Sequence, residues 1–106
     1  MTEPKSSPLE TLLDQISGRW TMYILWILDT YGTLRFGELR RKVTGISTKV
    51  LTERLRRLEA LDIIHRNYVP TIPPEVTYNL TERGQELSRT LDALCDLASR
   101  WYGAEE

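Results

Sequence analysis

The sequence predicts a mainly α-helical fold of the α+β class with a small β-hairpin, and two observations support this expectation. Two helical segments, 37–43 and 47–60, flank a short glycine-containing turn at 44–46. Two segments rich in β-forming residues, 63–69 and 76–80, follow directly and are separated by a proline-rich turn. A helix pair with a tight turn and then a hairpin is the arrangement of a winged helix-turn-helix.

The N-terminal third predicts a flexible arm and two helices. Residues 1–8 are polar and contain two prolines, so we expect an arm there and a single domain over 9–106. Apolar residues then recur at helical spacing up to about Ser17, and Gly18 ends this first helix. The segment 20–31 is apolar on nearly every side, which predicts a central, buried helix. Residues 34–36 suffice for one short strand.

The segment 47–60 has the pattern of a helix that reads DNA. Ser47 is placed as an N-cap, and Leu51, Leu55 and Leu58 form one inward stripe. In a helix-turn-helix the second helix enters the major groove, where hydroxyl and basic side chains reach base edges and phosphates. The predicted DNA-binding residues are Ser47, Thr48, Lys49, Thr52, Arg54, Arg56 and Arg57 on this helix and Arg66 and Tyr68 on the first hairpin strand.

The charge distribution supports contact with nucleic acid. The chain carries a net charge of −1. Residues 35–66 contain nine basic and four acidic residues, a local charge of +5, whereas the remainder carries −6. A basic segment within an acidic chain is the electrostatic pattern of a local DNA-binding face. A charge-rich surface that is merely solvated is the alternative interpretation.

The C-terminal segment predicts a long helix that begins after Thr81 and ends near Tyr102. Its apolar residues recur with heptad-like spacing, which suits packing against another helix. We expect the terminal helices to form a homodimer interface, although a partner within the same chain is the alternative. The predicted interface residues are Leu9, Leu12, Leu13, Leu87, Leu91, Leu94, Ala98 and Trp101.

The sparse cysteine and histidine content argues against an enzyme or a metal protein. A single cysteine, Cys95, forms no internal disulfide, and with the lone His65 it provides too few ligands for zinc. We therefore expect no metal and no cofactor, and we interpret Cys95 as a small hydrophobic residue. The longest apolar stretch, 22–28, is too short to span a membrane, and residues 1–10 lack a signal-peptide pattern. A cytoplasmic protein without membrane contact is expected.

Four motifs in the same order resemble the HxlR family of bacterial and archaeal transcription regulators, which are relatives of MarR. They are Gly18-Arg19-Trp20-Thr21, then Arg35-Phe36-x-Glu38-Leu39-Arg40-Arg41, then Gly45-Ile46-Ser47-x-Lys49-Val50-Leu51-Thr52-x-Arg54-Leu55-Arg56-x-Leu58-Glu59, and last Tyr68-x-Pro70-x-x-Pro73-Pro74-x-Val76-x-Tyr78-x-Leu80-Thr81. The resemblance covers about residues 8–101. It implies a dimeric winged helix-turn-helix protein that binds operator DNA, with residues 47–60 as the recognition helix and the terminal helices as the dimer interface.

Two positions depart from the family pattern. Members that sense oxidants or electrophiles carry a cysteine immediately before a proline ahead of the first helix, and here that position is Ser7. Serine forms neither a thiolate nor a disulfide, which argues against thiol sensing at this position. A basic residue often follows the prolines of the family's wing, whereas Glu75 stands there in this chain. Phosphate would repel this carboxylate, so we expect the wing to contact DNA weakly or through Arg66 and Tyr68.

The favoured hypothesis is a sequence-specific transcription regulator that binds a pseudo-palindromic operator as a homodimer. Two reading helices related by two-fold symmetry would lie about 34–36 Å apart, or a multiple of that distance. The alternative is a winged-helix module that binds a protein partner without reading DNA. The +5 segment favours DNA. A pocket between the aromatic segment 20–31 and the terminal helices is a candidate site for a small apolar effector.

Overall fold

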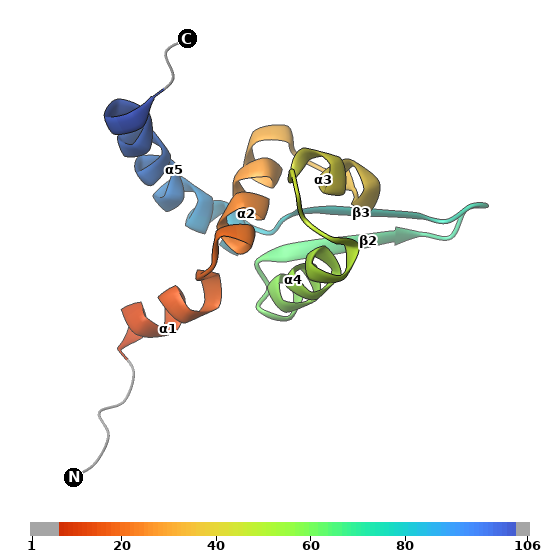
Figure 1. The fold of residues 1–106 in the computed structure, drawn as a ribbon. Helices are drawn as coiled ribbons and strands as arrows, with labels where there is room; N and C mark the ends of the chain where they lie inside the picture. The colour runs from red at the N-terminus through yellow and green to blue at the C-terminus, as the bar shows by residue number, and fades with distance from the viewer. Residues whose placement is uncertain (1–6, 104–106) are drawn as a thin grey trace.

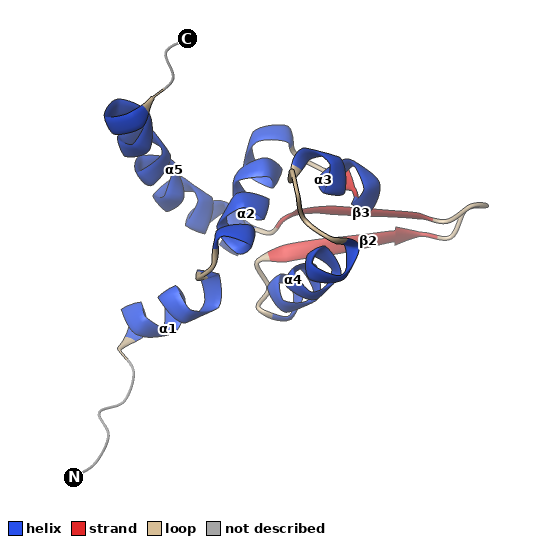
Figure 2. Cartoon of the chain, in the orientation of Figure 1, coloured by secondary structure: helices blue, strands red, loops and turns tan. Residues whose placement is uncertain are grey.

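The computed structural model describes residues 7–103, which form five helices and one three-stranded antiparallel sheet (Figures 1 and 2). The elements follow the order α1 (Pro8–Ile16), α2 (Arg19–Tyr31), β1 (Leu34–Arg35), α3 (Phe36–Lys42), α4 (Thr48–Ala60), β2 (Ile64–Val69), β3 (Glu75–Leu80) and α5 (Glu82–Tyr102). Helices α3 and α4 form the helix-turn-helix, and β2 and β3 form the wing. The predicted winged helix-turn-helix fold is confirmed.

The first helix begins earlier than the sequence predicts. An arm was expected over residues 1–8; residues 1–6 lie outside the described residues, and Ser7 and Pro8 already belong to the start of α1. The Ser7 hydroxyl accepts a hydrogen bond from the Glu10 backbone N–H, and the Glu10 carboxylate accepts one from the Ser7 backbone N–H, both at 3.0 Å. This capping box, with proline at the first helical position, fixes where the helix begins.

Helix α2 is buried on one side only, which corrects the prediction of a helix enclosed on all sides. Ile24, Leu25 and Leu28 are at most 2% exposed, and α2 contacts α3, α4, α5 and β3. Trp26 is 40% exposed and stacks on Tyr23, with ring centroids 5.8 Å apart. The neighbouring elements of the described chain cover one face of α2 and leave the Trp26 face in contact with solvent.

The sheet has the strand order β1-β3-β2. The hairpin strands pair along their whole length, from Ile64 opposite Leu80 to Val69 opposite Glu75. As predicted, a single short strand precedes the helix-turn-helix: Leu34 and Arg35 pair with Tyr78 and Thr77 of β3. Figure 1 shows the hairpin projecting to one side of the body, past α4. Strand β1 therefore connects the beginning of the helix-turn-helix to the wing.

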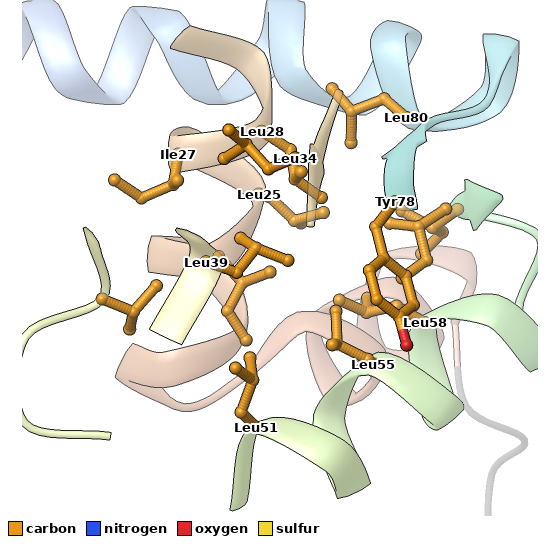
Figure 3. Close-up of a cluster of buried hydrophobic side chains, with 14 of the residues drawn as sticks. Leu25, Ile27, Leu28, Leu34, Leu39, Leu51, Leu55, Leu58, Tyr78 and Leu80 are labelled. Carbon is orange, nitrogen blue, oxygen red and sulfur yellow. The ribbon is translucent and has the colours of Figure 1, made fainter. Parts of the chain in front are cut away.

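The core lies between α2, α3, α4 and the sheet (Figure 3). Leu51, Leu55 and Leu58 of α4 are at most 2% exposed, which confirms the predicted inward stripe. Burial of a leucine side chain contributes roughly 1.5–3 kcal/mol, so three of them hold α4 firmly on the core. With one face of α4 fixed in this way, its opposite face is held outward.

Helix α5 begins in close contact with the segment that joins α4 to β2. The Thr81 hydroxyl accepts a hydrogen bond from the Gly84 backbone N–H at 3.0 Å, which makes Thr81 the predicted N-cap. The Thr81 backbone N–H donates to the Ile63 carbonyl at 3.1 Å. A Cβ atom on Gly84 would overlap that same Ile63 carbonyl oxygen. Only glycine allows the first turn of α5 to approach this backbone so closely.

The Gly84→Ala substitution is therefore expected to lower the free energy of unfolding by about 2 kcal/mol or more, because the clash is with backbone that has little room to move. Chemical denaturation followed by circular dichroism measures this change. Gly37→Ala is the matched control: a Cβ there meets only the Arg41 side chain at 3.7 Å. Alanine favours the helix by roughly 0.8–1 kcal/mol over glycine, so this control should be neutral or stabilising. Equal losses for both variants would contradict the proposed contact.

Candidate nucleic-acid interface

The turn between α3 and α4 positions the start of α4. Gly45 has φ +89°, a conformation that side chains rarely adopt, and it reverses the chain between the two helices. The Ser47 hydroxyl then accepts a hydrogen bond from the Val50 backbone N–H at 3.1 Å. Ser47 is thus the N-cap of α4, as predicted. The exposed side chains of Thr48 and Lys49 follow in the first turn.

A groove of about 600 Å³ separates α4 from the sheet. It brings four predicted DNA-binding residues together, with Thr48, Thr52 and Arg56 on α4 and Arg66 on β2. Hydroxyl and guanidinium groups are among the donors that contact phosphate oxygens in protein–DNA complexes. The apolar side chains that also line the groove, such as Phe36 and Val76, suit contact with deoxyribose. The complete lining is Phe36, Thr48, Thr52, Leu55, Arg56, Glu59, Arg66, Val76 and Tyr78.

Two further predicted residues lie beside this groove. Lys49 is exposed on α4, and Tyr68 is 56% exposed on β2. The Arg66 guanidinium carbon lies 5.9 Å from the centre of the Tyr68 ring, within range of a weak cation–π contact. Arg66 and Tyr68 are two residues apart on one strand and therefore share a face of the sheet. The hairpin thus presents one cation and one aromatic ring near α4.

Arg54 and Arg57 do not lie with this group. The Arg57 guanidinium donates to the Asp14 backbone carbonyl at 3.4 Å and lies 3.9 Å from the Asp14 carboxylate, so it connects α4 to α1. Arg54 is half-buried, and its Nε atom is buried without a hydrogen-bond partner among the described residues. Arg54 follows Leu51 by three positions and precedes Leu58 by four, which places it next to the buried stripe.

Glu75 has a partner that the sequence does not predict. The Arg35 guanidinium donates to the Glu75 carboxylate at 2.7 Å. The two residues are forty positions apart, and only the pairing of β1 with β3 brings them together. The Glu75 charge is therefore balanced by a residue of the neighbouring strand β1, which weakens the repulsion from phosphate that the sequence predicts. No sequence motif indicates that β1 pairs with β3. Arg35 could therefore not be identified from the sequence as the partner of Glu75.

The terminal helices α1 and α5 lie on the side of the molecule away from the hairpin tip (Figure 1), and several of their apolar side chains are exposed. Leu91 does not join it, because this side chain is 8% exposed and packs in the core of its own chain; Leu87 is half-buried against the same core. Part of the heptad-like pattern therefore packs within the chain, and the other part stays exposed. The exposed members are Leu9 at 63%, Leu12 at 36%, Leu13 at 51%, Leu94 at 52% and Trp101 at 66%, together with Ala98.

The effector pocket expected between α2 and the terminal helices stays a prediction. Trp20 and Tyr23 are partly buried and pack against the hydrophobic core. A groove of about 220 Å³ lies elsewhere, between α1 and α5, and includes Leu12 and Leu87. Core packing therefore accounts for the aromatic residues at the beginning of α2.

Cys95 is half-buried on α5 beside three carboxylates. Burial raises the pKa of this thiol, and the negative charges of Asp92, Asp96 and Asp29 raise it further.

Within residues 7–103, no cluster of three or more His, Cys, Asp or Glu residues is arranged to hold a metal ion. His65 is exposed on β2. None of the helices described is both long and apolar enough to cross a membrane.

The helix-turn-helix, its adjoining wing and the groove between them define a winged helix-turn-helix transcriptional regulator. Comparison with known families gives the more specific assignment. The chain belongs to the HxlR-like helix-turn-helix family, which matches residues 15–106. This confirms the resemblance that the sequence motifs indicate.

Individual relatives agree with this assignment. An uncharacterized HTH-type transcriptional regulator from Methanothermobacter thermautotrophicus is 38% identical over 98 residues, which cover 92% of this chain and 73% of the relative. The solved structure of the HTH-type regulator YtcD aligns with a TM-score of 0.85 and 37% identity, over 93% of this chain and all of that one. The redox regulator HypR in its reduced form aligns with a TM-score of 0.83 and 36% identity, over 89% and 92% of the two chains.

The environment of Cys95 predicts an unreactive thiol. Only the thiolate reacts with iodoacetamide, so a raised pKa moves the pH midpoint of alkylation upward. We expect this midpoint to lie above that of the same cysteine in the urea-unfolded chain, as measured by mass spectrometry across a pH series. Asp92→Asn should move the midpoint of the folded protein back towards the unfolded value. A folded midpoint at or below the unfolded one would contradict the assigned electrostatic environment.

Proposed function

We propose that the protein is a sequence-specific regulator that binds a pseudo-palindromic operator as a homodimer, with α4 of each subunit in the major groove. The groove between α4 and the wing supports the proposal most strongly, because it gathers Thr48, Thr52, Arg56 and Arg66 beside the exposed face of the helix. Clustered arginine and threonine donors next to a helix of this kind suit a DNA backbone.

The proposed contacts differ in kind. Lys49 and the hydroxyl of Thr48 lie in the first turn of α4, where residues of a recognition helix contact base edges. Arg56 and Arg66 flank the groove from opposite sides and bind phosphates there, and Thr52 donates to the same backbone. Tyr68 provides apolar contact on the wing. We assign Arg57 to positioning, because it is already engaged with Asp14 of α1.

The exposed surface of the terminal helices supports dimerisation. Leu9 and Leu13 of α1 and Leu94 and Trp101 of α5 are each at least 51% exposed within the described chain. Exposed large apolar side chains on the two terminal helices suit an interaction surface, and two-fold dimers are the commonest arrangement. A second copy of the chain would bury this surface and place two reading helices for two half-sites.

Thiol sensing at the first helix is not part of the proposed function. HypR is described as a redox regulator. In the present chain Ser7 acts as the N-cap of α1 through its hydroxyl, and a serine supplies no thiolate. We propose a cytoplasmic regulator with no cofactor. A protein-binding module without DNA readout is the alternative; a gel shift with genomic fragments, positive for DNA only in the first case, distinguishes the two.

The Arg56→Ala variant should weaken DNA binding by about tenfold near 0.1 M salt and reduce the slope of log affinity against log salt by about one. Arg57→Ala is the matched control, since it removes the same charge from the next residue, which faces α1. It should change affinity much less. Fluorescence anisotropy with a duplex selected on the wild-type protein measures both. If the two variants lose affinity equally, the assignment of the groove as the phosphate site is wrong.

The Leu94→Asp variant should shift the protein from dimer to monomer in sedimentation velocity, because it places a charge in the proposed apolar interface. Leu94 is 52% exposed in the single chain, so the subunit itself should stay folded by circular dichroism. Ile72→Asp introduces the same charge at a fully exposed apolar position far from the terminal helices and should remain dimeric. A folded Leu94→Asp protein that is still a dimer would exclude this interface.

A further inference from the structure

A tyrosine of the hydrophobic core forms part of the groove between α4 and the sheet. Tyr78 of β3 lines this groove together with Thr52 and Arg56 of α4 and Arg66 of β2. Only 8% of Tyr78 is exposed, so its ring belongs to the core. Figure 3 shows the ring extending from β3 towards α4, with the hydroxyl oxygen at its far end. The ring is therefore buried, while the side chain still reaches the groove.

The Tyr78 hydroxyl is free to bind a ligand. The side-chain hydrogen bonds between the hairpin strands run from Asn67 to Thr77 and Asn79. They do not involve Tyr78, and the buried side-chain atoms of residues 7–103 that lack a partner belong to other residues. An unpaired hydroxyl that is not fully buried is open to solvent, and the groove is the opening that Tyr78 lines. The hydroxyl can donate a hydrogen bond there without losing one inside the protein.

The sheet and the core fix the position of this hydroxyl. Tyr78 lies on the central strand of the sheet, opposite Arg66 of β2 on one side and Leu34 of β1 on the other. Burial already restricts its two side-chain torsions, so binding a ligand costs little further side-chain entropy. An exposed arginine, by contrast, loses considerable freedom when it binds. Tyr78 therefore holds a donor at a fixed depth in the groove before any ligand arrives.

The groups around this hydroxyl suit a single phosphate. Arg56 and Arg66 supply positive charge from α4 and β2, and Thr52 supplies a second hydroxyl. Glu59 also lines the groove. It follows Arg56 by three positions, about one helical turn, so its carboxylate repels an anion from the C-terminal end of α4. The part of the groove that favours an anion is therefore the part beside Thr52, Arg56 and Tyr78.

We propose that the Tyr78 hydroxyl donates a hydrogen bond to the one backbone phosphate that Arg56 and Arg66 attract, and thereby sets the depth and register of α4 on the DNA. This inference rests on the proposed DNA-binding function and adds to it a positioning residue from the core. Phosphate contacts fix the register of a protein on the duplex without reading bases. A neutral donor adds direction rather than charge, so its contribution does not depend on salt as that of an arginine does.

The test compares Tyr78→Phe, which keeps the ring and removes only the hydroxyl, with the wild-type protein on a duplex that the wild-type protein selects from a random library. Tyr78→Phe should weaken binding about tenfold. The slope of log affinity against log salt should stay the same, whereas Arg66→Ala should reduce it by about one. The free energy of unfolding should not change, because no hydrogen bond within the chain is lost.

Tyr68→Phe is the matched control, since it removes the same atom from an exposed tyrosine of the same hairpin. It should keep wild-type affinity. An equal loss of affinity in both variants, or a lower free energy of unfolding for Tyr78→Phe, would overturn the inference.

A second measurement locates the contact. In a series of duplexes, a neutral methylphosphonate replaces one phosphate at a time. At the phosphate in the groove, Tyr78→Phe should lose less affinity than the wild-type protein, because its hydrogen bond is already absent. Arg66→Ala should show the same coupling at the same phosphate. Full affinity of Tyr78→Phe, or a loss coupled to no phosphate, would overturn the inference and leave the proposed function intact. Wild-type protein that selects no duplex would overturn the proposed function itself.

Discussion

The packing of one leucine stripe determines the arrangement on which the rest of the molecule depends. Leu51, Leu55 and Leu58 are buried against α2, α3 and the sheet, and this burial fixes the rotation of α4 about its axis. A helix that turned by a third of a revolution would expose leucine and bury arginine, which costs far more than it gains. The packing of the core therefore determines which side chains α4 presents on its outer face.

The wing depends on a second constraint, the pairing of β1 with β3. Leu34 and Arg35 of β1 pair with Tyr78 and Thr77 of β3 and so attach the beginning of α3 to the hairpin. The same pairing brings Arg35 to Glu75 and thereby balances the charge of this carboxylate. An exposed ion pair of this kind contributes little to stability, at most about 1 kcal/mol. Its significance is electrostatic, because it leaves the hairpin tip nearly neutral.

The terminal helices pack on the helix-turn-helix and the wing. Helix α1 contacts the body through buried Ile16 and through the contact of Asp14 with Arg57 of α4. The first turn of α5 packs closely on the segment before β2, whereas its later residues Leu94 and Trp101 remain exposed. In the proposed dimer, the position of each reading helix thus follows from how two copies join their terminal helices. The contact between Arg57 of α4 and Asp14 of α1 connects α4 directly to one of these terminal helices.

Local sequence alone determined the helices, the strands and most of the fold. Relations between residues close in sequence were enough to predict the caps Ser47 and Thr81, the leucine stripe, the proline-rich hairpin turn and the basic segment. Most of the groove residues on α4 also follow from helical spacing. Tertiary structure decided what depends on contacts between distant residues. Spacing cannot show that Arg57 meets Asp14, that Arg35 meets Glu75, that Leu91 packs inward or that one face of α2 stays exposed. The physical reason is that helical and strand periods fix directions within one element, whereas the partner in each direction is set by how the elements pack.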